Sequence, residues 1–522
     1  MLTSRARWAG LICLLAAVIL TAPLAYHNLA EPDFWFDESG QFWLAKGLNH
    51  FSPPLSAAGS WRDVLENNRQ YNLDPGGFTL LLHYWTAFGE DPGWLRALPF
   101  AFLVIAVFHF MLIAWKLSGS KVIAVLASVV ALLPFPMILD YGFELRAYSM
   151  EVAGIVASLF WLIKTLEHPT RSNLAALGVT AAFFLGSRYS FVIAVVAIGV
   201  VLLFQVYRRS LKQYITRGWG FYLPVAAGMV YIWLSMLRYQ DPGGVPPGHV
   251  TTLILRFQSL PEIIGRIYTN LFSFQYSSFL LFILAVPLIG VIRPDFLGPE
   301  RGRYYWGVWL WALSFQGVSI VLSALGKYPW AVNSRWNLNL QSVAAVSLCL
   351  LLLLAIDYLR QLSWVIGNKR WLKVVAVGCC LALVLIGFNR QVHHSQDDTT
   401  YANLQLLGDA RLSSARVFVG YYAGPSVRYL FEYGPLRHRG DIYPQAFYFE
   451  GRQEYLSQSK IDADQFDIML LALADPEMVA KYRQRSGSRF DVFPGPPRPY
   501  LLVKEQQLGG RSGETTSEIV RP

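Results

Sequence analysis

Two adjacent carboxylates stand among aromatic residues close to the N-terminus of the chain. Asp37 and Glu38 follow Trp35 in a short segment that is otherwise rich in phenylalanine and tryptophan. Acidic side chains beside an apolar run are costly to bury and therefore mark candidate functional sites. A carboxylate in such a place can act as the general base that takes a proton from an attacking hydroxyl group. The alternative is that Asp37 simply caps the helix running toward Gly47, with the aromatic rings forming an interfacial belt.

A second acidic group surrounds Arg146 at the start of an apolar run. Asp140 and Glu144 precede this arginine, and Tyr148 and Glu151 follow it. On one continuous helix Glu144, Tyr148 and Glu151 would share a face, because they stand at i, i+4 and i+7. Arg146 would then lie about 200° around the helix from Glu144, and a guanidinium there can hold a phosphate group. In the alternative, Glu144 bonds only to Tyr148 and Arg146 extends to phospholipid headgroups.

Basic residues form a third group, near a turn that follows the apolar run 304–325. Lys327 and Arg335 flank several aromatic residues there, and Arg188 opens another apolar run. Fixed cations stabilise the charge that develops on a departing phosphate group. Together with a carboxylate base, they predict displacement of a phosphate from a sugar carbon by a hydroxyl group. Lys327 and Arg335 can instead anchor a helix end at the membrane interface, and Arg188 carries little signal of its own.

The composition indicates what kind of chain must position these groups. Of the 522 residues, 54% are apolar and 15% are charged, whereas roughly 25% are charged in a soluble domain. Runs long enough to cross a bilayer as helices lie near residues 8–26, 94–115, 121–139, 149–165, 172–187, 190–206, 219–237, 274–292, 304–325, 337–359 and 371–388. The sequence therefore predicts an all-α polytopic membrane bundle of about 11 transmembrane helices.

The charge balance and the cysteines exclude two other classes of function. The formal net charge of +10 is explained by basic loops on the cytoplasmic side of a membrane, so no nucleic-acid partner is expected. The four cysteines are Cys13, Cys349, Cys379 and Cys380. All of them lie inside apolar runs without the spacing of a disulfide framework or a zinc site. Cysteine chemistry is therefore not expected to be the function.

Residues 76–89 decide the sidedness of the predicted bundle. They are apolar but number only 14, which is too short for a helix to cross a core of roughly 30 Å. If they do not cross, the Lys and Arg clusters after them fall on the cytoplasmic side. We therefore expect an amphipathic helix on the outer membrane face. Its buried stripe would be Phe78, Leu81, Leu82, Trp85 and Phe88.

This topology places all three polar groups on the outer face. The segment 27–93 becomes the first outer loop, and it contains both the Asp37 motif and the interfacial helix. The N-terminal run could also pass for a signal peptide. A retained first helix fits better, because the loop that follows it carries the carboxylate pair.

The composition changes after residue 389. We expect a transmembrane domain over 1–389, a small soluble α/β domain over 390–505 and a disordered tail over 506–522. Within the soluble domain, strands are predicted at 415–420 and 466–472, with a helix at 424–433 between them. This domain would lie on the same outer side as the polar groups.

At these residues the chain resembles the polytopic C-type (GT-C) glycosyltransferases that use polyprenyl-phosphate sugars. This group includes the protein O-mannosyltransferases and the lipid A aminoarabinose transferases. The resemblance covers about residues 8–360 and rests on a pattern rather than on one motif. The matching segments are Trp35-Phe36-Asp37-Glu38, Asp74-Pro75 through Gly89, Leu95-Arg96 through Pro99, Glu144-Leu145-Arg146-Ala147-Tyr148-Ser149 and Arg335-Trp336.

The resemblance implies a GT-C bundle with outer-face interfacial helices and a single inverting displacement. Asp37 and Glu38 would be the catalytic residues, with Asp37 as the base. The donor phosphate would be held by Arg146, Arg335 and Lys327, and the site would be shaped by Asp140, Glu144, Tyr148 and Trp35. The expected partners are a polyprenyl-phosphate sugar donor, a glycan, lipid or protein acceptor, and the bilayer. The protein is expected in the plasma (bacterial inner) membrane, with its site and C-terminal domain on the periplasmic or extracellular side.

The sequence departs from the family pattern in two places. The interfacial helix begins Asp74-Pro75-Gly76 where relatives have His-Pro-Pro, so no histidine role is expected there. Trp336 replaces a tyrosine after Arg335, which keeps the cation and loses a phenol. Some relatives bind a divalent metal near these acids. The candidate ligands here are Asp37, Glu38, Asp140 and Glu144, a hard oxygen set without a clear histidine partner.

Two other classes of function fit the same residues. A transporter or flippase for a polyprenyl-linked or anionic lipid would also place acids and arginines in a membrane cavity. Inverted repeats and helices broken near the bilayer midplane would favour it, and neither is visible in the sequence. A non-catalytic partner in a glycan-assembly complex is the second alternative, and the intact Asp37 argues against it.

Overall fold

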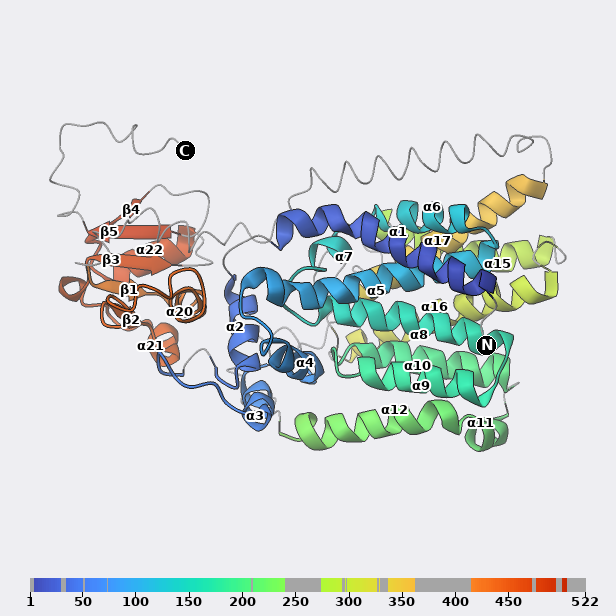
Figure 1. Ribbon diagram of the computed structural model, residues 1–522, viewed down its shortest axis with the longest axis horizontal. Helices are drawn as coiled ribbons and strands as arrows, with labels where there is room; N and C mark the ends of the chain where they lie inside the picture. Colours follow the sequence, from blue (N-terminus) through green and yellow to red (C-terminus); the bar gives the residue numbers. More distant parts are fainter. Residues whose placement is uncertain are drawn as a thin grey trace. The chain divides into compact units, whose positions relative to one another are not determined.

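The computed structural model of the chain describes two compact units. The described residues are 4–29, 34–49, 52–72, 74–207, 210–239, 274–292, 296, 298–325, 328, 337–361, 415–471, 476–493 and 500–504. Unit 1 comprises Met1–Leu29, Asn68–Leu81 and Arg96–Val392. Unit 2 comprises Ala30–Asn67, Leu82–Leu95 and His393–Pro522. Figure 1 labels the helices and strands of both.

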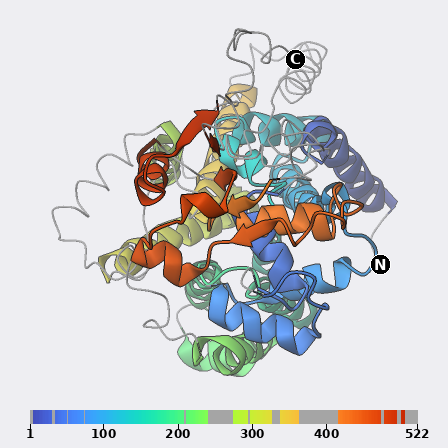
Figure 2. The ribbon, with the colours of Figure 1, turned by 90° about the vertical axis from the view of Figure 1, so that its left-hand side faces the viewer.

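Unit 1 is a bundle of helices that run side by side in Figure 1, many of them seen nearly end-on in Figure 2. The elements up to residue 206 are α1 (Ser4–Asn28), α5 (Pro92–Ser118), α6 (Lys121–Leu132), α7 (Pro136–Asp140), α8 (Tyr148–Glu167), α9 (Arg171–Phe184), α10 (Phe191–Val201) and the π-helical η1 (Leu202–Val206). After them come α11 (Leu211–Arg217), α12 (Trp219–Ile232), the π-helical η2 (Trp233–Leu237), α15 (Phe274–Ile292), α16 (Gly298–Ala324) and α17 (Leu338–Gln361).

Helix α8 lies in the interior of this bundle. It contacts α9, α10, α16 and α17, and its side chains are buried almost all round the helix. A helix that is apolar on every face is stable only when neighbours cover it completely. Helices α9 and α12 approach each other closely at Gly178, where an added Cβ would lie 2.5 Å from the carbonyl oxygen of Gly220. Small residues at such a crossing allow two backbones to pack directly.

Five helices in the described part of the chain are long and apolar enough to cross a membrane. They are α5, α8, α12 with η2, α16 and α17 over Leu338–Tyr358. The bent pair Phe191–Val206 and Leu211–Arg217 would make a sixth. The predicted span 121–139 is divided into α6 and α7, because Pro134 and Pro136 lack the backbone N–H that would continue the helical hydrogen bonds, and Phe135 between them is non-helical. The predicted span 371–388 lies outside the described residues.

Unit 2 contains a five-stranded sheet with helices on both faces. Its strands are β1 (Val417–Val419), β2 (Phe447–Phe449), β3 (Ile468–Leu471), β4 (Phe490–Phe493) and β5 (Tyr500–Lys504). The strand order is β2-β1-β3-β5-β4. Strand β1 is parallel to β2 and β3, whereas β5 runs antiparallel to β3 and β4. The helices between β1 and β4 along the chain are α20 (Gly424–Glu432), α21 (Arg452–Ser457), the short 3-10 helix η4 (Ala463–Gln465) and α22 (Pro476–Arg485).

Alternating side chains of the central strands build one core on each face of the sheet. On one face Val417 and Val419 pack with Leu430 of α20. On the other face Phe418 packs with Tyr482 of α22. This alternation is the period of two expected of a strand covered on both sides. The predicted strands at 415–420 and 466–472 and the helix at 424–433 are confirmed as β1, β3 and α20.

The segment between α1 and α5 contains three short helices, α2 (Phe36–Ala45), α3 (Trp61–Tyr71) and α4 (Gly77–Trp85). Helix α4 confirms the short helix predicted within 76–89, although it ends four residues earlier. Phe78 and Leu82 are buried as predicted. Phe88 lies beyond the end of this helix, so it does not continue the predicted stripe along it. The fold class predicted from the sequence, a polytopic helical bundle with a small C-terminal α/β domain, is confirmed.

Candidate functional site

A buried group of charged side chains in unit 1 centres on Arg188. Its Nη1 lies 3.3 Å from Glu151 Oε2, and its Nε lies 3.8 Å from Asp74 Oδ1. Arg146 Nη2 lies 3.8 Å from the other carboxylate oxygen of Asp74. Asp74 therefore stands between two arginines, and we call Asp74, Arg146, Glu151 and Arg188 the arginine cluster.

Helix α8 and the turn between α9 and α10 position two members of the arginine cluster. Glu151 is in the first turn of α8 and accepts a hydrogen bond of 2.5 Å from Ser190 Oγ. Arg188 is in the turn between α9 and α10, and its guanidinium lies 4.8 Å from the centre of the Tyr148 ring. Such stacking on an aromatic face favours a buried cation. The side chains of Glu151 and Arg188 are 0% and 9% exposed.

A close backbone contact brings Asp74 to this place. The Gly77 N–H donates to the Gly186 carbonyl at 3.0 Å, and an added Cβ on Gly77 would lie 2.6 Å from that oxygen. Only glycine allows two turns to approach so closely. Asn68 Nδ2 donates to the Asp74 carbonyl at 2.8 Å, which fixes the turn from its other side.

The prediction that Glu144, Tyr148 and Glu151 share one helix face is wrong. Helix α8 begins at Tyr148, and Glu144 lies before it. The Arg146 N–H is 2.6 Å from the Glu144 carbonyl, so the backbone makes a tight turn where the prediction continued the helix. Glu144 is nevertheless fully buried, and Asp140 is the last residue of α7.

The distances within the arginine cluster indicate what it can bind. Both Asp74 contacts are 3.8 Å long, which is beyond an N–H···O hydrogen bond. The Asp74 carboxylate therefore holds the two guanidinium groups by charge more than by direct bonding. Each guanidinium presents five N–H donors in a planar fork that suits a phosphate group. The cluster can thus exchange contacts among its own members for contacts with an anionic ligand.

The carboxylate pair predicted from the sequence lies at the start of α2 in unit 2. Asp37 and Glu38 are in the first helical turn, and the residue that caps the helix is Trp35. The alternative that Asp37 caps this helix is therefore wrong. Negative charge in the first turn is favoured by the helix dipole. Glu38 is fully buried, whereas Asp37 is half-buried and is the more accessible of the two.

Helix α2 packs on α20, a contact between residues almost four hundred positions apart. Ser39 Oγ lies 2.9 Å from Ser426 Oγ, and Trp43 Nε1 donates to the Pro425 carbonyl at 3.0 Å. The Arg428 guanidinium lies 4.1 Å from the centre of the Trp43 ring. Sequence reasoning missed this pairing. An arginine and a serine inside an otherwise apolar helix were its only signal.

Arg428 also binds the backbone of the segment between α2 and α3. Its Nη1 donates to the Ser52 carbonyl at 2.7 Å, and its Nη2 donates to the Pro53 carbonyl at 3.3 Å. Its Nε lies 3.1 Å from Glu432 Oε1 in an ion pair whose side chains are 2% and 3% exposed. The C-terminal domain thereby fixes the segment that follows α2.

A cavity of about 560 Å³ opens beside the end of α2. It is lined by Lys46, His83, Tyr84, Thr86, Ala87, Phe88, Gly89 and Glu90. Lys46 Nζ lies 2.5 Å from Glu90 Oε1 and 5.0 Å from the centre of the Tyr433 ring. Burial raises the pKa of Tyr433, and the charges of Glu90 and Glu432 raise it further, so this phenol stays protonated.

Two of the predicted phosphate-binding residues, Lys327 and Arg335, lie outside the described residues. Their neighbour Tyr328 donates a hydrogen bond of 2.6 Å to Asn339 Oδ1 in unit 1. Among the described residues, no three or more His, Cys, Asp or Glu side chains gather closely enough to hold a metal ion. The candidate metal ligands Asp37, Glu38, Asp140 and Glu144 thus gain no support, and we derive no step through a metal.

Comparison with known proteins finds similarity in structure and none in sequence. No protein-family model matches the chain, and no curated protein sequence matches it significantly. ArnT from Cupriavidus metallidurans in the apo state matches with a TM-score of 0.50 and 13% identity, covering 98% of this chain and 100% of ArnT. ArnT bound to undecaprenyl phosphate matches with a TM-score of 0.46 and 13% identity over 97% and 99% of the two chains.

A third solved structure, the arabinosyltransferase EmbB from Mycobacterium smegmatis, has a TM-score of 0.41 and 14% identity. The match covers 68% of this chain and 31% of EmbB, so this chain spans about a third of that protein. At these identities the likeness to apo ArnT shows the fold. It confirms the GT-C fold that the sequence resemblance implied.

Proposed function

We propose that this chain is a membrane glycosyltransferase that moves a sugar from a polyprenyl-phosphate donor to an acceptor hydroxyl or phosphate group. The observation that carries the proposal is the arginine cluster, in which Asp74 holds the guanidinium groups of Arg146 and Arg188 3.8 Å away on either side. Paired arginines are the side chains best suited to a phosphate group, because they bind it with two parallel hydrogen bonds. ArnT, whose fold this chain shares, has been solved with undecaprenyl phosphate bound.

The proposed reaction is one displacement at the anomeric carbon of the donor sugar. The acceptor oxygen forms a bond to that carbon, and the bond between the carbon and the phosphate oxygen breaks with its electron pair. The acceptor proton passes to the Asp37 carboxylate. The polyprenyl phosphate leaves, and its added charge is stabilised by Arg146 and Arg188. Attack opposite the leaving group inverts the anomeric centre.

The two carboxylates of α2 take different parts in this proposal. Asp37 is half-buried and can meet an acceptor, whereas Glu38 is fully buried. We therefore assign the base to Asp37 and a positioning role to Glu38. Lys327 and Arg335 remain further candidates for phosphate contacts, and Trp35, Asp140, Glu144 and Tyr148 for shaping the site, on the strength of the sequence alone. We place the reaction on the outer membrane face from the distribution of Lys and Arg among the loops.

The experiment that tests the proposal measures sugar transfer by the full chain in lipid nanodiscs. Undecaprenyl-phosphate donors with different labelled sugars are supplied together with a membrane extract as the source of acceptors. The variants are Asp37→Asn and, as a matched control, Glu477→Gln, whose carboxylate is 77% exposed on α22. We expect one donor to be consumed, Glu477→Gln to equal wild type, and Asp37→Asn to lose about 100-fold in rate with its thermal unfolding unchanged.

Two results would overturn the proposal. If no donor transfers its sugar, the chain is not a transferase of this class, and movement of the labelled lipid between leaflets becomes the next assay. If Asp37→Asn transfers sugar at the wild-type rate, the base is another group and the assigned mechanism is wrong.

A further inference from the structure

Three tyrosine rings of the C-terminal domain gather beside the Asp37 helix. Tyr421 and Tyr455 are stacked, with ring centres 5.0 Å apart and an angle of 14° between their planes. Tyr422 meets both rings edge-on, at 5.2 Å and 5.4 Å. Phe36 of α2, the residue before Asp37, lies 4.9 Å from Tyr422. We call Tyr421, Tyr422 and Tyr455 the tyrosine surface.

The tyrosine surface lies where ligands bind in many α/β domains. Tyr421 and Tyr422 follow the carboxyl end of β1, and Tyr455 is on α21, which follows β2. Strand β1 lies between β2 and β3. The chain therefore runs from β1 to β2 on one side, and then crosses to β3 on the other side of β1. Ligands of open α/β sheets characteristically bind at the carboxyl ends of the strands where the strand order reverses in this way.

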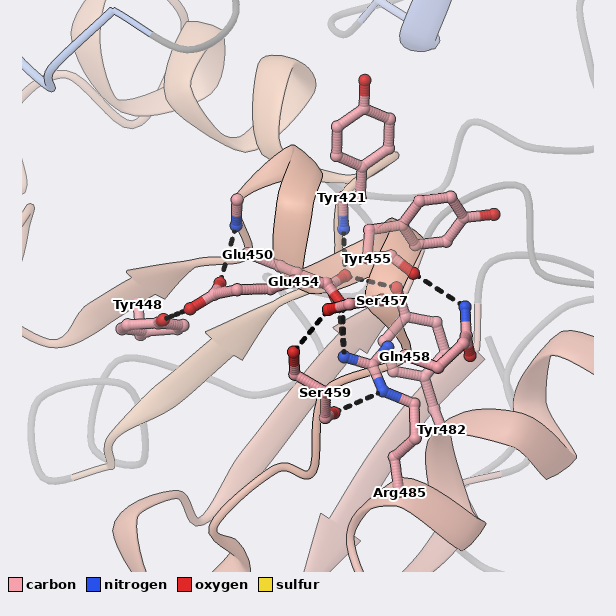
Figure 3. A network of polar contacts seen from close by, with 11 residues as sticks. Tyr421, Tyr448, Glu450, Glu454, Tyr455, Ser457, Gln458, Ser459, Tyr482 and Arg485 are labelled. Atoms are coloured by element: carbon pink, nitrogen blue, oxygen red, sulfur yellow. Dashed lines mark hydrogen bonds and ion pairs between the residues drawn. The ribbon is translucent and has the colours of Figure 1, made fainter. Parts of the chain in front are cut away.

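A buried ionic network fixes the backbone that carries this surface. The Tyr421 N–H donates to Glu450 Oε2 at 2.9 Å, and Tyr482 donates to the same oxygen at 2.5 Å. Arg485 Nη2 lies 2.7 Å from Glu450 Oε1. Figure 3 shows the Tyr421 side chain extending away from this network while its backbone nitrogen remains bonded to Glu450. The backbone of Tyr421 is therefore fixed by Glu450, while its ring does not take part in that bond. A side chain held in this way is preorganised for binding.

The three rings are also partly exposed at the surface of the domain. All of them are half-buried, and neither Tyr421 nor Tyr422 belongs to the two hydrophobic cores of the domain. Burial raises the pKa of Tyr422, and its hydrogen bond with Tyr455 and the charge of Asp37 raise it further. Burial raises the pKa of Tyr421 as well. These phenols therefore keep their protons at neutral pH.

We propose that the tyrosine surface binds the ring of a sugar next to Asp37, with the C–H face of the sugar stacked on the aromatic rings. Sugar rings combine an apolar face with a rim of hydroxyl groups, which matches rings that carry phenolic donors. The proposal deepens the proposed function and rests on it for the identity of the ligand. The sugar belongs either to the donor or to a glycan acceptor, and these sources share the same chemistry.

The test combines direct binding with kinetics on the full chain in nanodiscs. Saturation-transfer NMR with methyl glycosides of glucose, galactose, mannose and arabinose reports binding of a sugar ring without requiring turnover. The variants are Tyr421→Ala and Tyr422→Ala, with Tyr422→Phe to keep the ring and remove the hydroxyl. Tyr231→Ala is the matched control, because Tyr231 is 46% exposed on α12 in unit 1. Thermal unfolding of every variant reports whether it is folded.

We expect saturation of sugar ring protons in wild type and Tyr231→Ala, and an affinity about tenfold lower in the two alanine variants of the surface. Tyr422→Phe should retain most of the affinity. If the donor KM of the alanine variants rises about as much as their sugar affinity falls, the surface binds the donor sugar. If the acceptor KM rises instead, the surface binds the acceptor. If no glycoside gives a signal in wild type, or if folded alanine variants bind as wild type does, the proposal is overturned.

The outcomes separate this proposal from the proposed function. Tyrosine-dependent sugar binding by a chain that consumes no donor would leave the sugar surface standing and refute the transferase. Normal transfer with unchanged sugar binding and KM values in both folded alanine variants would refute the surface and leave the transferase standing.

Discussion

Arg188 and Glu151 form an ion pair of 3.3 Å inside the helical bundle, and their side chains are 9% and 0% exposed. Taking two charges out of water is costly, and their mutual attraction repays that cost only while both are present. The hydrogen bond from Ser190 to Glu151 and the Tyr148 ring beside Arg188 complete their surroundings. The pair therefore fixes the position of the Arg188 guanidinium inside the bundle.

Removing one member of this pair should destabilise the protein more than removing both. Arg188→Gln leaves the buried Glu151 carboxylate without its cation, at an expected cost of roughly 3–5 kcal/mol. Glu151→Gln leaves Arg188 with its longer contact to Asp74. The double variant should cost less than the sum of the two single changes. Thermal unfolding of the four proteins in the same detergent gives the coupling energy of the pair. Additive effects would show that the two side chains are not coupled.

Arg146 should contribute to donor affinity through its guanidinium rather than through charge alone. Arg146→Gln is expected to raise the donor KM by about tenfold, because it removes a charge-assisted contact to phosphate. Arg146→Lys should recover part of the loss, since lysine keeps the charge and loses the planar fork. Steady-state kinetics with Arg171→Gln, a change at an exposed arginine of α9, provide the comparison. An unchanged donor KM in Arg146→Gln would count against the arginine cluster as the phosphate site.

The sequence predicted the parts of the fold that depend on local patterns. Apolar runs located most helices of unit 1, and short apolar runs located the buried strands β1 and β3. The carboxylate pair at Asp37 and Glu38 was found because acids among aromatic residues are rare near a membrane. The predicted span 149–165 agrees with α8, but the argument about its polar face extended the helix back to Glu144, where the backbone instead makes a tight turn at Arg146.

Contacts between distant segments could not be predicted in the same way. Arg188 meets Asp74 because Gly77 and Gly186 let two turns touch, and neither glycine shows its partner in the sequence. Likewise Ser39 and Ser426 are ordinary small polar residues until α2 and α20 pack together. One sequence without related sequences contains the local periods but not these pairings.

An alkaline titration should reveal the contact between Tyr448 and Glu454. The Tyr448 hydroxyl donates to Glu454, and this bond together with burial raises the pKa of Tyr448 to about 12. The folded pKa lies above the value of about 10 in an unfolded chain, so the contribution to stability is present below pH 10 and is lost as the pH rises toward 12. The unfolding temperature of wild type should therefore fall more steeply over this range than that of Tyr448→Phe. Parallel curves for the two proteins would show that the contact contributes nothing.

Arg428 should be required to keep the Asp37 segment ordered. It donates to the carbonyls of Ser52 and Pro53, stacks on Trp43 and pairs with Glu432, and its side chain is 2% exposed. A lysine keeps the charge but cannot reach these acceptors from one planar group. We expect Arg428→Lys to remain folded and to lose most of its sugar transfer.

Hydrogen exchange on the full chain distinguishes this local effect from general destabilisation. In Arg428→Lys, amides of α2 and the amide of Ser52 should exchange faster than in wild type, because α2 packs on the helix that Arg428 belongs to. Amides of α8 lie in the other unit and should keep their rates. Arg483→Lys is the control, since Arg483 donates to a backbone carbonyl at Phe490 and makes its contact away from α2. Equal exchange in α2 for wild type and Arg428→Lys would mean that the C-terminal domain does not hold the Asp37 helix in place.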